Sequence, residues 1–206
     1  MTACTSLTDI EVDNNALSGE IRLDFPSLRN LTLFYAWKNR LTGGVPASLA
    51  DAPSLQAVDL SYNNLTGPIP KELFGLQNLT KLLLLNNELS GFIPPEIGNC
   101  TSLYRLRLNG NRLSGTIPAE IGNLKNLNFL DMSENHLVGP VPAAISGCAS
   151  LEFLDLHSNA LSGALPDALP RSLQLIDVSE NQLVGPLSSS LGSMPELTKL
   201  YLGMNR

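Results

Sequence analysis

Basic residues are scarce in this 206-residue chain, which carries 13 Lys and Arg against 19 Asp and Glu for a net charge of -6. Nucleic acids and acidic lipid surfaces bind concentrated basic faces, so this deficit argues against nucleic acid as a partner. Long apolar runs are also absent: residues 82–85 form one of the longest, whereas a bilayer span needs about twenty residues. We therefore expect no direct membrane contact by this segment. Residues 1–6 also lack the pattern of a signal peptide.

Recognisable catalytic motifs are absent as well. The chain has no phosphate-binding glycine loop and no kinase catalytic-loop or D-F-G motif. Its two histidines, His136 and His157, occupy different positions of the repeat described below and share no metal-ligand spacing. Asp131, Asp155 and Asp177 recur along the chain, but nothing on an open, solvated surface would desolvate one of them into a catalytic acid. We expect no enzyme, no catalytic residue, no metal site and no cofactor.

One phrase, L-x-x-L-x-L-x-x-N-x-L-x-G-x-I-P-x-x-L, repeats along the whole chain. The ninth position of each unit is always Asn, the thirteenth is Gly in all eight complete units, and the sixteenth is Pro in six of the eight. This periodicity is the signature of a solenoid. We expect the tail of a preceding repeat at 1–6 and one repeat domain at 7–206. Its eight full units start at residues 7, 31, 55, 79, 103, 127, 151 and 173, and a partial ninth starts at 197.

Each recurring position has a physical role. Alternating leucines around the fourth to sixth positions predict a short strand with one buried face. Strands one period apart then stack into a parallel sheet over a continuous core. The Asn column turns inward, where its amides satisfy buried backbone groups of neighbouring coils. Gly at the thirteenth position permits a tight bend, and Pro fixes the backbone on the opposite face without donating a hydrogen bond.

The three cysteines, Cys4, Cys100 and Cys148, occupy the same position of the repeat. Strands stack about 4.8 Å apart, which places Cys100 and Cys148, two periods apart, roughly 10 Å from each other. That separation is beyond the reach of a disulfide. We expect free, buried thiols that fill apolar space.

The outward-facing strand positions are where such a scaffold would bind a ligand. Arg105 and Arg107 project side by side from one strand, with Lys81 one coil away, in an otherwise acidic protein. Two neighbouring guanidinium groups form a fork suited to a carboxylate, sulfate or phosphate. Cross-strand pairing of Arg107 with Asp131 and Asp155 is the alternative, and the spacing alone leaves both interpretations open.

Four Asn-x-Thr sequons are candidate N-glycosylation sites, and together they favour an extracellular parent protein. None lies on the expected strand face, which leaves that face free for a ligand. The sites are Asn30, Asn64, Asn78 and Asn99.

The L-x-G-x-I-P phrase after each strand resembles the plant-specific class of leucine-rich repeats, and the resemblance covers essentially the whole chain. It implies an α/β fold class: a right-handed leucine-rich-repeat solenoid with a parallel β-sheet on the concave face and little regular helix. The convex face would carry 3-10 or irregular segments. Extracellular members close each end with paired cysteines, and neither pair is present here. We therefore expect a fragment of a longer array or a truncated gene product.

Residues 102–115, with the phrase R-L-R, resemble one coil of plant receptor-like serine/threonine kinases that perceive small secreted peptide hormones. Residues 34–37, 78–85 and 91–95 are similar to the branch of root meristem growth factor receptors. The resemblance implies that Arg105 and Arg107 hold the C-terminal carboxylate of an extended peptide on the concave face. Residues of preceding coils would line the peptide track: Tyr35, Trp37, Asp59, Lys81, Leu83 and Leu85.

The same resemblance implies a membrane receptor kinase as the parent, with this segment on the extracellular side of the plasma membrane and a co-receptor kinase ectodomain as a second partner. The chain departs from the branch in lacking the R-x-G-G element that reads sulfated tyrosine, so either that element belongs to earlier coils or the ligand differs. Two other functions stay open. One is a protein-interaction module such as a secreted inhibitor of a wall-degrading enzyme, and the other is a truncated product with no independent role.

Overall fold

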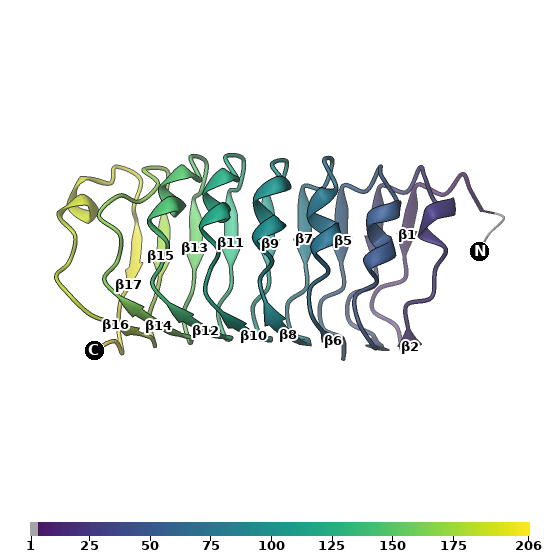
Figure 1. The fold of residues 1–206 in the computed structure, drawn as a ribbon, viewed down its shortest axis with the longest axis horizontal. Helices are drawn as coiled ribbons and strands as arrows, with labels where there is room; N and C mark the ends of the chain where they lie inside the picture. Colours follow the sequence, from purple (N-terminus) through teal and green to yellow (C-terminus); the bar gives the residue numbers. More distant parts are fainter. Residues whose placement is uncertain (1–3) are drawn as a thin grey trace.

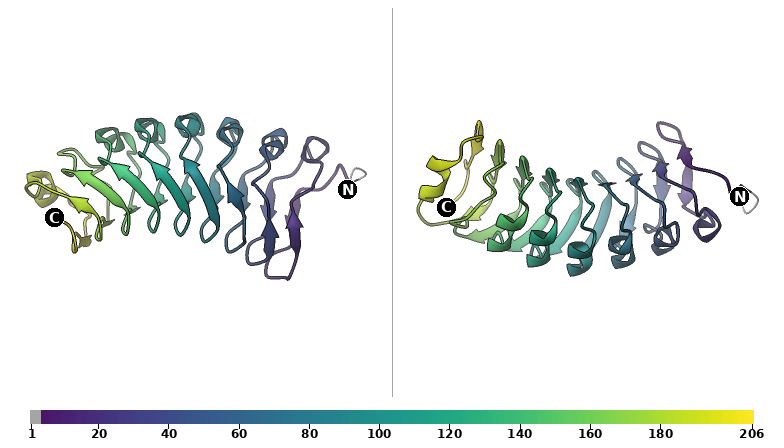
Figure 2. Two further views of the ribbon diagram at one scale, coloured as in Figure 1. Left: turned by 60° about the horizontal axis from the view of Figure 1, so that its bottom comes forward. Right: turned by 90° about the horizontal axis from the view of Figure 1, so that it is seen from above.

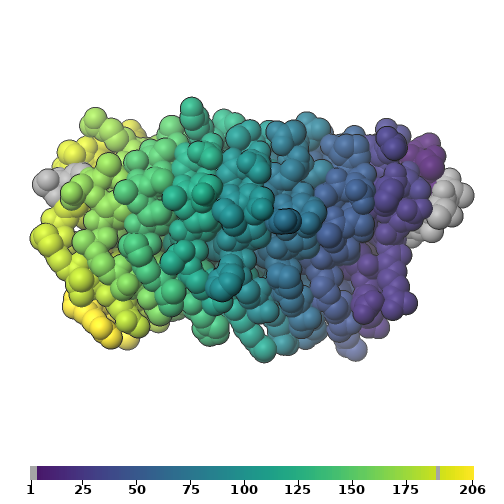
Figure 3. All heavy atoms as spheres, in the orientation of Figure 1, coloured from purple at the N-terminus to yellow at the C-terminus, as the bar shows by residue number. Residues whose placement is uncertain are grey.

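The computed structural model describes residues 4–206, with positions 189 and 190 described by their backbone alone. The chain winds into a right-handed solenoid whose coils follow one another in sequence order along a curved array (Figures 1 and 2). Figure 3 shows the stacked coils as a continuous, elongated body. Residues 1–3 of the expected tail at 1–6 lie outside the described residues. Within the described part, no helix has the length and hydropathy that a membrane crossing requires.

One strand from each coil joins a parallel sheet on the concave face, which has nine strands within residues 4–206. Neighbouring strands pair in register one repeat apart, so that Arg107 lies opposite Asp131. Each strand spans the third to fifth positions of its repeat, one residue earlier than the alternating leucines predict. The strands are β1 (Asp9–Glu11), β3 (Leu33–Tyr35), β5 (Ala57–Asp59), β7 (Lys81–Leu83), β9 (Arg105–Arg107), β11 (Phe129–Asp131), β13 (Phe153–Asp155), β15 (Leu175–Asp177) and β17 (Lys199–Tyr201).

A second set of parallel strands, which the repeat pattern does not predict, runs along one side of the solenoid. In β10 the strand ends at Gly115, whose φ of 75° confirms the tight bend expected at the thirteenth position. The strands form a pair, β2 (Ser18–Glu20) and β4 (Arg40–Thr42), and a longer row, β6 (Thr66–Gly67), β8 (Glu88–Phe92), β10 (Arg112–Gly115), β12 (His136–Gly139), β14 (Ala160–Gly163) and β16 (Gln182–Leu183).

Short 3-10 helices cover the convex face, as expected (Figure 2). Pro118 directly precedes one of them with a φ of -67°, which shows how the Pro column sets the backbone before the turn. The coil that is two residues shorter than the others has no 3-10 helix in residues 164–172. The helices are η1 (Phe25–Ser27), η2 (Ala47–Asp51), η3 (Lys71–Gly75), η4 (Pro95–Asn99), η5 (Ala119–Asn123), η6 (Ala143–Gly147) and η7 (Ser189–Ser193).

The Asn column forms the expected ladder beside a continuous leucine core. Asn111 is 7% exposed, and its Nδ2 donates to the carbonyl oxygens of Leu84 and Leu108, each at 3.0 Å. Its Oδ1 accepts the backbone N–H of Leu89 at 3.0 Å. Each amide therefore joins backbone groups of separate coils. The same pattern recurs at Asn39, Asn63, Asn87, Asn135, Asn159, Asn181 and Asn205.

All three cysteines are free, and the expectation of buried thiols is confirmed for Cys100 and Cys148. Their thiols donate to the carbonyl oxygens of Leu76 at 3.3 Å and Ile121 at 3.1 Å. Burial raises the pKa of each of these two thiols to about 12. The expectation is wrong for Cys4, which is exposed because no described coil covers it.

Candidate functional site

Strand β9 places two arginines together on the concave face. Leu106 between them is fully buried, so the side chains of Arg105 and Arg107 both point away from the core. The guanidinium carbon of Arg105 lies 4.7 Å from the ring centre of Phe129, and that of Arg107 lies 5.5 Å from the same centre. The two cationic groups therefore lie over one aromatic ring, side by side as expected.

Arg107 has an acidic partner on the next strand. Its Nη2 donates to Asp131 Oδ2 at 3.1 Å, which confirms the cross-strand alternative for this residue. The Arg107 side chain remains 32% exposed, whereas the Asp131 side chain is 5% exposed. No ion pair from Arg107 to Asp155 is found in residues 4–206. The buried carboxylate fixes one edge of the guanidinium and leaves part of Arg107 open to the concave face.

Arg105 makes no ion pair within the described residues. In the sheet register it lies between Lys81 and Phe129, neither of which can neutralise it. The Phe129 ring in turn stacks on Phe153, with ring centres 4.0 Å apart and planes 4° from parallel. Cation–π contacts contribute about 0.5–1 kcal/mol at exposed sites. We infer that this aromatic pair supports the Arg105 guanidinium from one side.

Both arginines also carry unused donors. The buried Nε atoms of Arg105 and Arg107 have no hydrogen-bond partner in the described part of the chain. Leaving such a donor unpaired is unfavourable unless a ligand or water supplies an acceptor. Exposed Lys81 lies beside Arg105 in the sheet register, so three cations lie on two adjacent strands, and Asp131 pairs with one of them. The chemistry of this cluster suits an anionic group with several acceptor oxygens.

The six residues expected to line a peptide track differ in how much surface they present. Leu85 is only 5% exposed and so offers little contact area. Burial is the main cause that raises the pKa of Asp59, and the Arg107 charge opposes it. Burial and the negative charge of Asp59 raise the pKa of Tyr35. Half-buried positions are Tyr35, Trp37, Asp59 and Leu83, and Lys81 is exposed.

The four sequon asparagines are all exposed and lie off the concave sheet. The Nδ2 atom of Asn30 donates to Thr5 O at 3.3 Å, and that of Asn78 donates to Pro53 O at 3.2 Å. The structure leaves all four side chains within reach of solvent, and their glycosylation stays a prediction.

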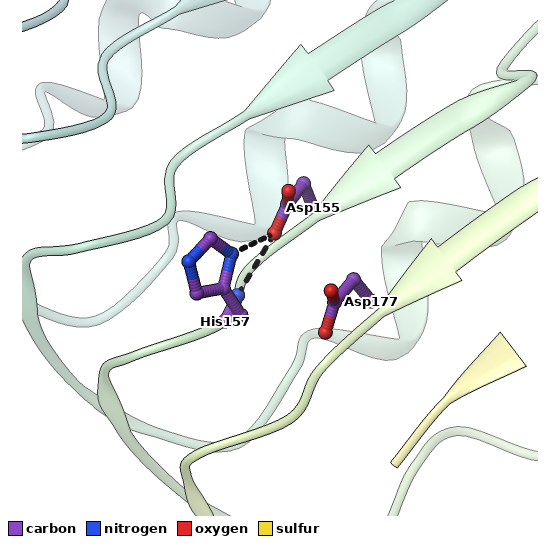
Figure 4. A group of neighbouring side chains, drawn as sticks. All are labelled: Asp155, His157 and Asp177. Atoms are coloured by element: carbon purple, nitrogen blue, oxygen red, sulfur yellow. Dashed lines mark hydrogen bonds and ion pairs between the residues drawn. The ribbon is translucent and has the colours of Figure 1, made fainter. Parts of the chain in front are cut away.

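The structure also brings together three residues that the sequence analysis leaves apart. Asp155 Oδ1 lies 2.7 Å from His157 Nδ1, and Asp177 faces this pair from the adjacent strand (Figure 4). Burial is the main cause that raises the pKa of Asp155, so the open, solvated setting expected for this aspartate is wrong. One signal in the sequence points to the cluster: His157 occupies a column in which Ser133 and Ser179 occupy the neighbouring coils.

A curved parallel sheet with a cationic cluster on its open concave face defines the class: solenoid repeat proteins, which use such extended concave surfaces for binding. The chain belongs to the leucine-rich repeat family. A family model described as leucine rich repeat matches residues 26–89 and 101–161, and a second model of the same description matches residues 172–194. A search of curated proteins finds no match.

Several solved structures match the whole chain. A plant peptide hormone receptor, RGFR1 in complex with RGF2, is 64% identical with a TM-score of 0.98, and the match covers 100% of this chain and 33% of that one. The ectodomain of the Arabidopsis thaliana receptor kinase GASSHO1/SCHENGEN3, in complex with CASPARIAN STRIP INTEGRITY FACTOR 2, is 40% identical with a TM-score of 0.97, covering 100% and 25%.

A third match is the leucine-rich repeat ectodomain of the Arabidopsis receptor kinase HAESA with an N-terminally extended IDA peptide hormone ligand, 33% identical with a TM-score of 0.93, covering 99% and 35%. The chain thus spans about a quarter to a third of the length of these proteins. Another HAESA structure contains the hormone IDA and the co-receptor SERK1; it is 30% identical with a TM-score of 0.79, covering 98% and 39%.

Proposed function

We propose that the chain is a ligand-binding part of a plant receptor kinase ectodomain and that it binds an extended secreted peptide on its concave face. The C-terminal carboxylate of the peptide would be held by Arg105 and Arg107. The observation that carries the proposal is Arg105, which makes no ion pair within residues 4–206 and whose buried Nε lacks an acceptor there, next to Arg107 and Lys81. The similarity to receptors solved with peptide hormones supports the same function.

A peptide carboxylate matches this cluster in charge and in geometry. It has two oxygens, which accept parallel hydrogen bonds from guanidinium groups. Asp131 already occupies one edge of Arg107, so Arg105 would supply the larger share of the new contacts. The body of the peptide would then run along the half-buried surface of Tyr35, Trp37 and Leu83 toward the N-terminal coils.

The relatives support a wider proposal. The parent protein would be a serine/threonine receptor kinase, with this segment on the extracellular side of the plasma membrane and the kinase outside this chain. A co-receptor ectodomain would bind the peptide-loaded solenoid, as SERK1 accompanies HAESA and IDA in one of the matched structures.

The test is calorimetric titration of this chain with synthetic RGF2, the peptide bound to the 64% identical receptor, with its C-terminus either free or amidated. Replacing both Arg105 and Arg107 by Ala should weaken binding of the free-acid peptide by about 3 kcal/mol, roughly a hundredfold in Kd. Arg112→Ala is the matched control, because Arg112 lies in the same coil but pairs with Glu88 at 3.0 Å on β8, away from the concave sheet.

Amidation should weaken binding to the unchanged protein by a similar factor and have little further effect on the double variant, since the two changes remove the same contact. Absence of any RGF2 binding would count against the peptide as ligand. Binding that is indifferent to both the double substitution and amidation would reject the role of the two arginines while leaving peptide binding intact.

A further inference from the structure

A second group of polar residues lies on the concave face, two coils beyond the arginines. In each of the four coils with an aspartate at the fifth position, that aspartate accepts a hydrogen bond from the backbone N–H of the residue two positions later. The partner is Ser in three coils and His157 in the fourth. The backbone contacts are Ser61 N to Asp59 at 3.0 Å, Ser133 N to Asp131 at 3.2 Å, His157 N to Asp155 at 3.1 Å and Ser179 N to Asp177 at 3.0 Å.

The imidazole is therefore the exception at a position that serine occupies in the other coils with this aspartate. In neighbouring coils the side chain of Ser133 donates to Asp131 Oδ1 at 2.7 Å, and that of Ser179 donates to Asp177 Oδ1 at 2.6 Å. A serine at position 157 would make the same contact with Asp155. A histidine adds a ring nitrogen that can bind a metal ion, which a serine lacks.

Negative charge surrounds this imidazole. Asp155 and Asp177 lie opposite each other in the sheet register, and no Lys or Arg pairs with either of them within residues 4–206. This differs from Asp131 one strand earlier, whose second oxygen is neutralised by Arg107. Glu134 approaches from the other side, with its Oε1 3.7 Å from His157 Nε2. Three carboxylates thus face one imidazole, and a dication would offset their mutual repulsion.

We propose that Asp155, His157 and Asp177 form a binding site for a divalent transition-metal ion such as Zn²⁺. One ligand atom from each residue lies within 4.8 Å of the others. Figure 4 shows how the three side chains lie on their two neighbouring coils. Zinc bonds of about 2.0–2.2 Å place tetrahedral ligand atoms about 3.4 Å apart. Side-chain rotations that move the ligand atoms by about 1 Å would therefore bring them to zinc-binding distances.

The donor set selects the class of ion. An imidazole nitrogen with carboxylate oxygens suits zinc and its neighbours among the transition metals, whereas Ca²⁺ and Mg²⁺ prefer oxygen ligands alone. The side chains of His157 and Asp155 are 27% and 15% exposed, so the ion would be reached from the concave face. Glu134, 59% exposed, lies at the other ring nitrogen and stays outside the site, so the remaining coordination positions would face solvent or a bound partner.

This proposal revises the expectation of no metal site. That expectation rested on the spacing of the two histidines in the sequence. The structure supplies Asp155 from the same coil and Asp177 from the next one, and the spacing of the two histidines detects neither. The site does not depend on the proposed peptide function, because none of its three ligands belongs to the arginine cluster.

The test is calorimetric titration with ZnCl₂ on the whole chain, in a Cys4→Ser background that removes the exposed thiol. We expect one ion per chain and no comparable binding of Ca²⁺. His157→Ser should weaken zinc binding at least about tenfold. This variant installs the residue of the neighbouring coils, so it retains the hydrogen bond to Asp155. An unchanged far-ultraviolet circular dichroism spectrum checks that it folds.

His136→Ser is the matched control, because His136 is exposed on β12 and lies outside the cluster. It should leave zinc affinity unchanged. As an independent readout, the ring proton resonances of His157 should shift on addition of one equivalent of zinc while those of His136 stay in place. Equal affinity in the His157→Ser variant, or no saturable binding by the Cys4→Ser protein, would overturn the proposal.

Discussion

Replacing Asn111 by Ala should lower the free energy of unfolding by about 3–5 kcal/mol. The substitution leaves the backbone N–H of Leu89 without its acceptor in a buried setting, which costs about 1–3 kcal/mol. The carbonyl oxygens of Leu84 and Leu108 each lose one hydrogen bond, at about 1 kcal/mol apiece. Neither oxygen is fully orphaned, because each also accepts from the asparagine of an adjacent coil.

Asn15→Ala is the matched control. Asn15 occupies the same column but is exposed in the first coil, where its Nδ2 donates to Val12 O and Asp13 O. Its loss should cost about 1 kcal/mol or less. Urea unfolding followed by circular dichroism and by the fluorescence of Trp37, the only tryptophan, measures both variants. Coincident transitions by the two probes would justify a two-state treatment.

Equal losses of stability in the Asn111→Ala and Asn15→Ala variants would refute the stabilising role of the buried Asn111 amide. That result would mean that water replaces the Asn111 amide at no net cost, and that burial of leucines alone aligns the coils. A change in the slope of the urea transition, without a change in its midpoint, would point instead to loss of cooperativity between coils.

Three further predictions concern separate parts of the molecule. Gly122→Ala should cost about 1–3 kcal/mol in urea unfolding, because the new Cβ would collide with a carbonyl oxygen of the next coil, whereas Gly75→Ala has nothing within 4 Å and should change stability by less than about 0.5 kcal/mol. Cys4 should react with a thiol reagent in the native protein, and Cys100 should react only after denaturation. An equal rate for both would contradict the burial described above. In metal-free buffer, NMR titration should give His157 a pKa above 6.5: burial lowers it, but the hydrogen bond and charge of the neighbouring aspartate outweigh that effect. This protonation stabilises the fold below pH 6.5, and the gain is lost as the pH rises through the folded-state pKa; a value at or below 6.5 would exclude it.

The fold was predictable because one sequence period specifies every coil. Leucines at fixed positions require a common core, and the Asn ladder then sets the register between coils. The side sheet was not predictable, because its strands follow from how the coils stack and not from a local pattern. The eighth position of each unit also has a positive φ, for example 54° at Lys38 and 54° at Tyr62, although these residues do not favour that conformation. The hydrogen bonds of the following asparagine compensate for the local cost.

The sequence was enough to predict that Arg105 and Arg107 lie together, but not which of them forms an ion pair. Strand alternation alone places Arg105 and Arg107 on one face. The register sets Phe129 beside Arg105 and Asp131 beside Arg107, but only the side-chain positions show that one arginine is neutralised and the other is not. Leu85 could not be predicted in this way. The repeat pattern places it at an outward-facing position, but in the structure neighbouring residues bury its side chain.

The seventh coil, which is two residues shorter than the others, should affect the local curvature of the solenoid. A solenoid curves when its convex layer of 3-10 helices is thicker than its concave layer of strands, because each coil is then wider on the convex side. The outer layer is interrupted between η6 and η7, where residues 164–172 have no helical turn, while the inner strands β13, β15 and β17 continue at their usual pairing. We therefore expect curvature to relax locally at this coil. Whatever docks near the carboxyl end of the array would meet a flatter surface than the one that faces the arginines.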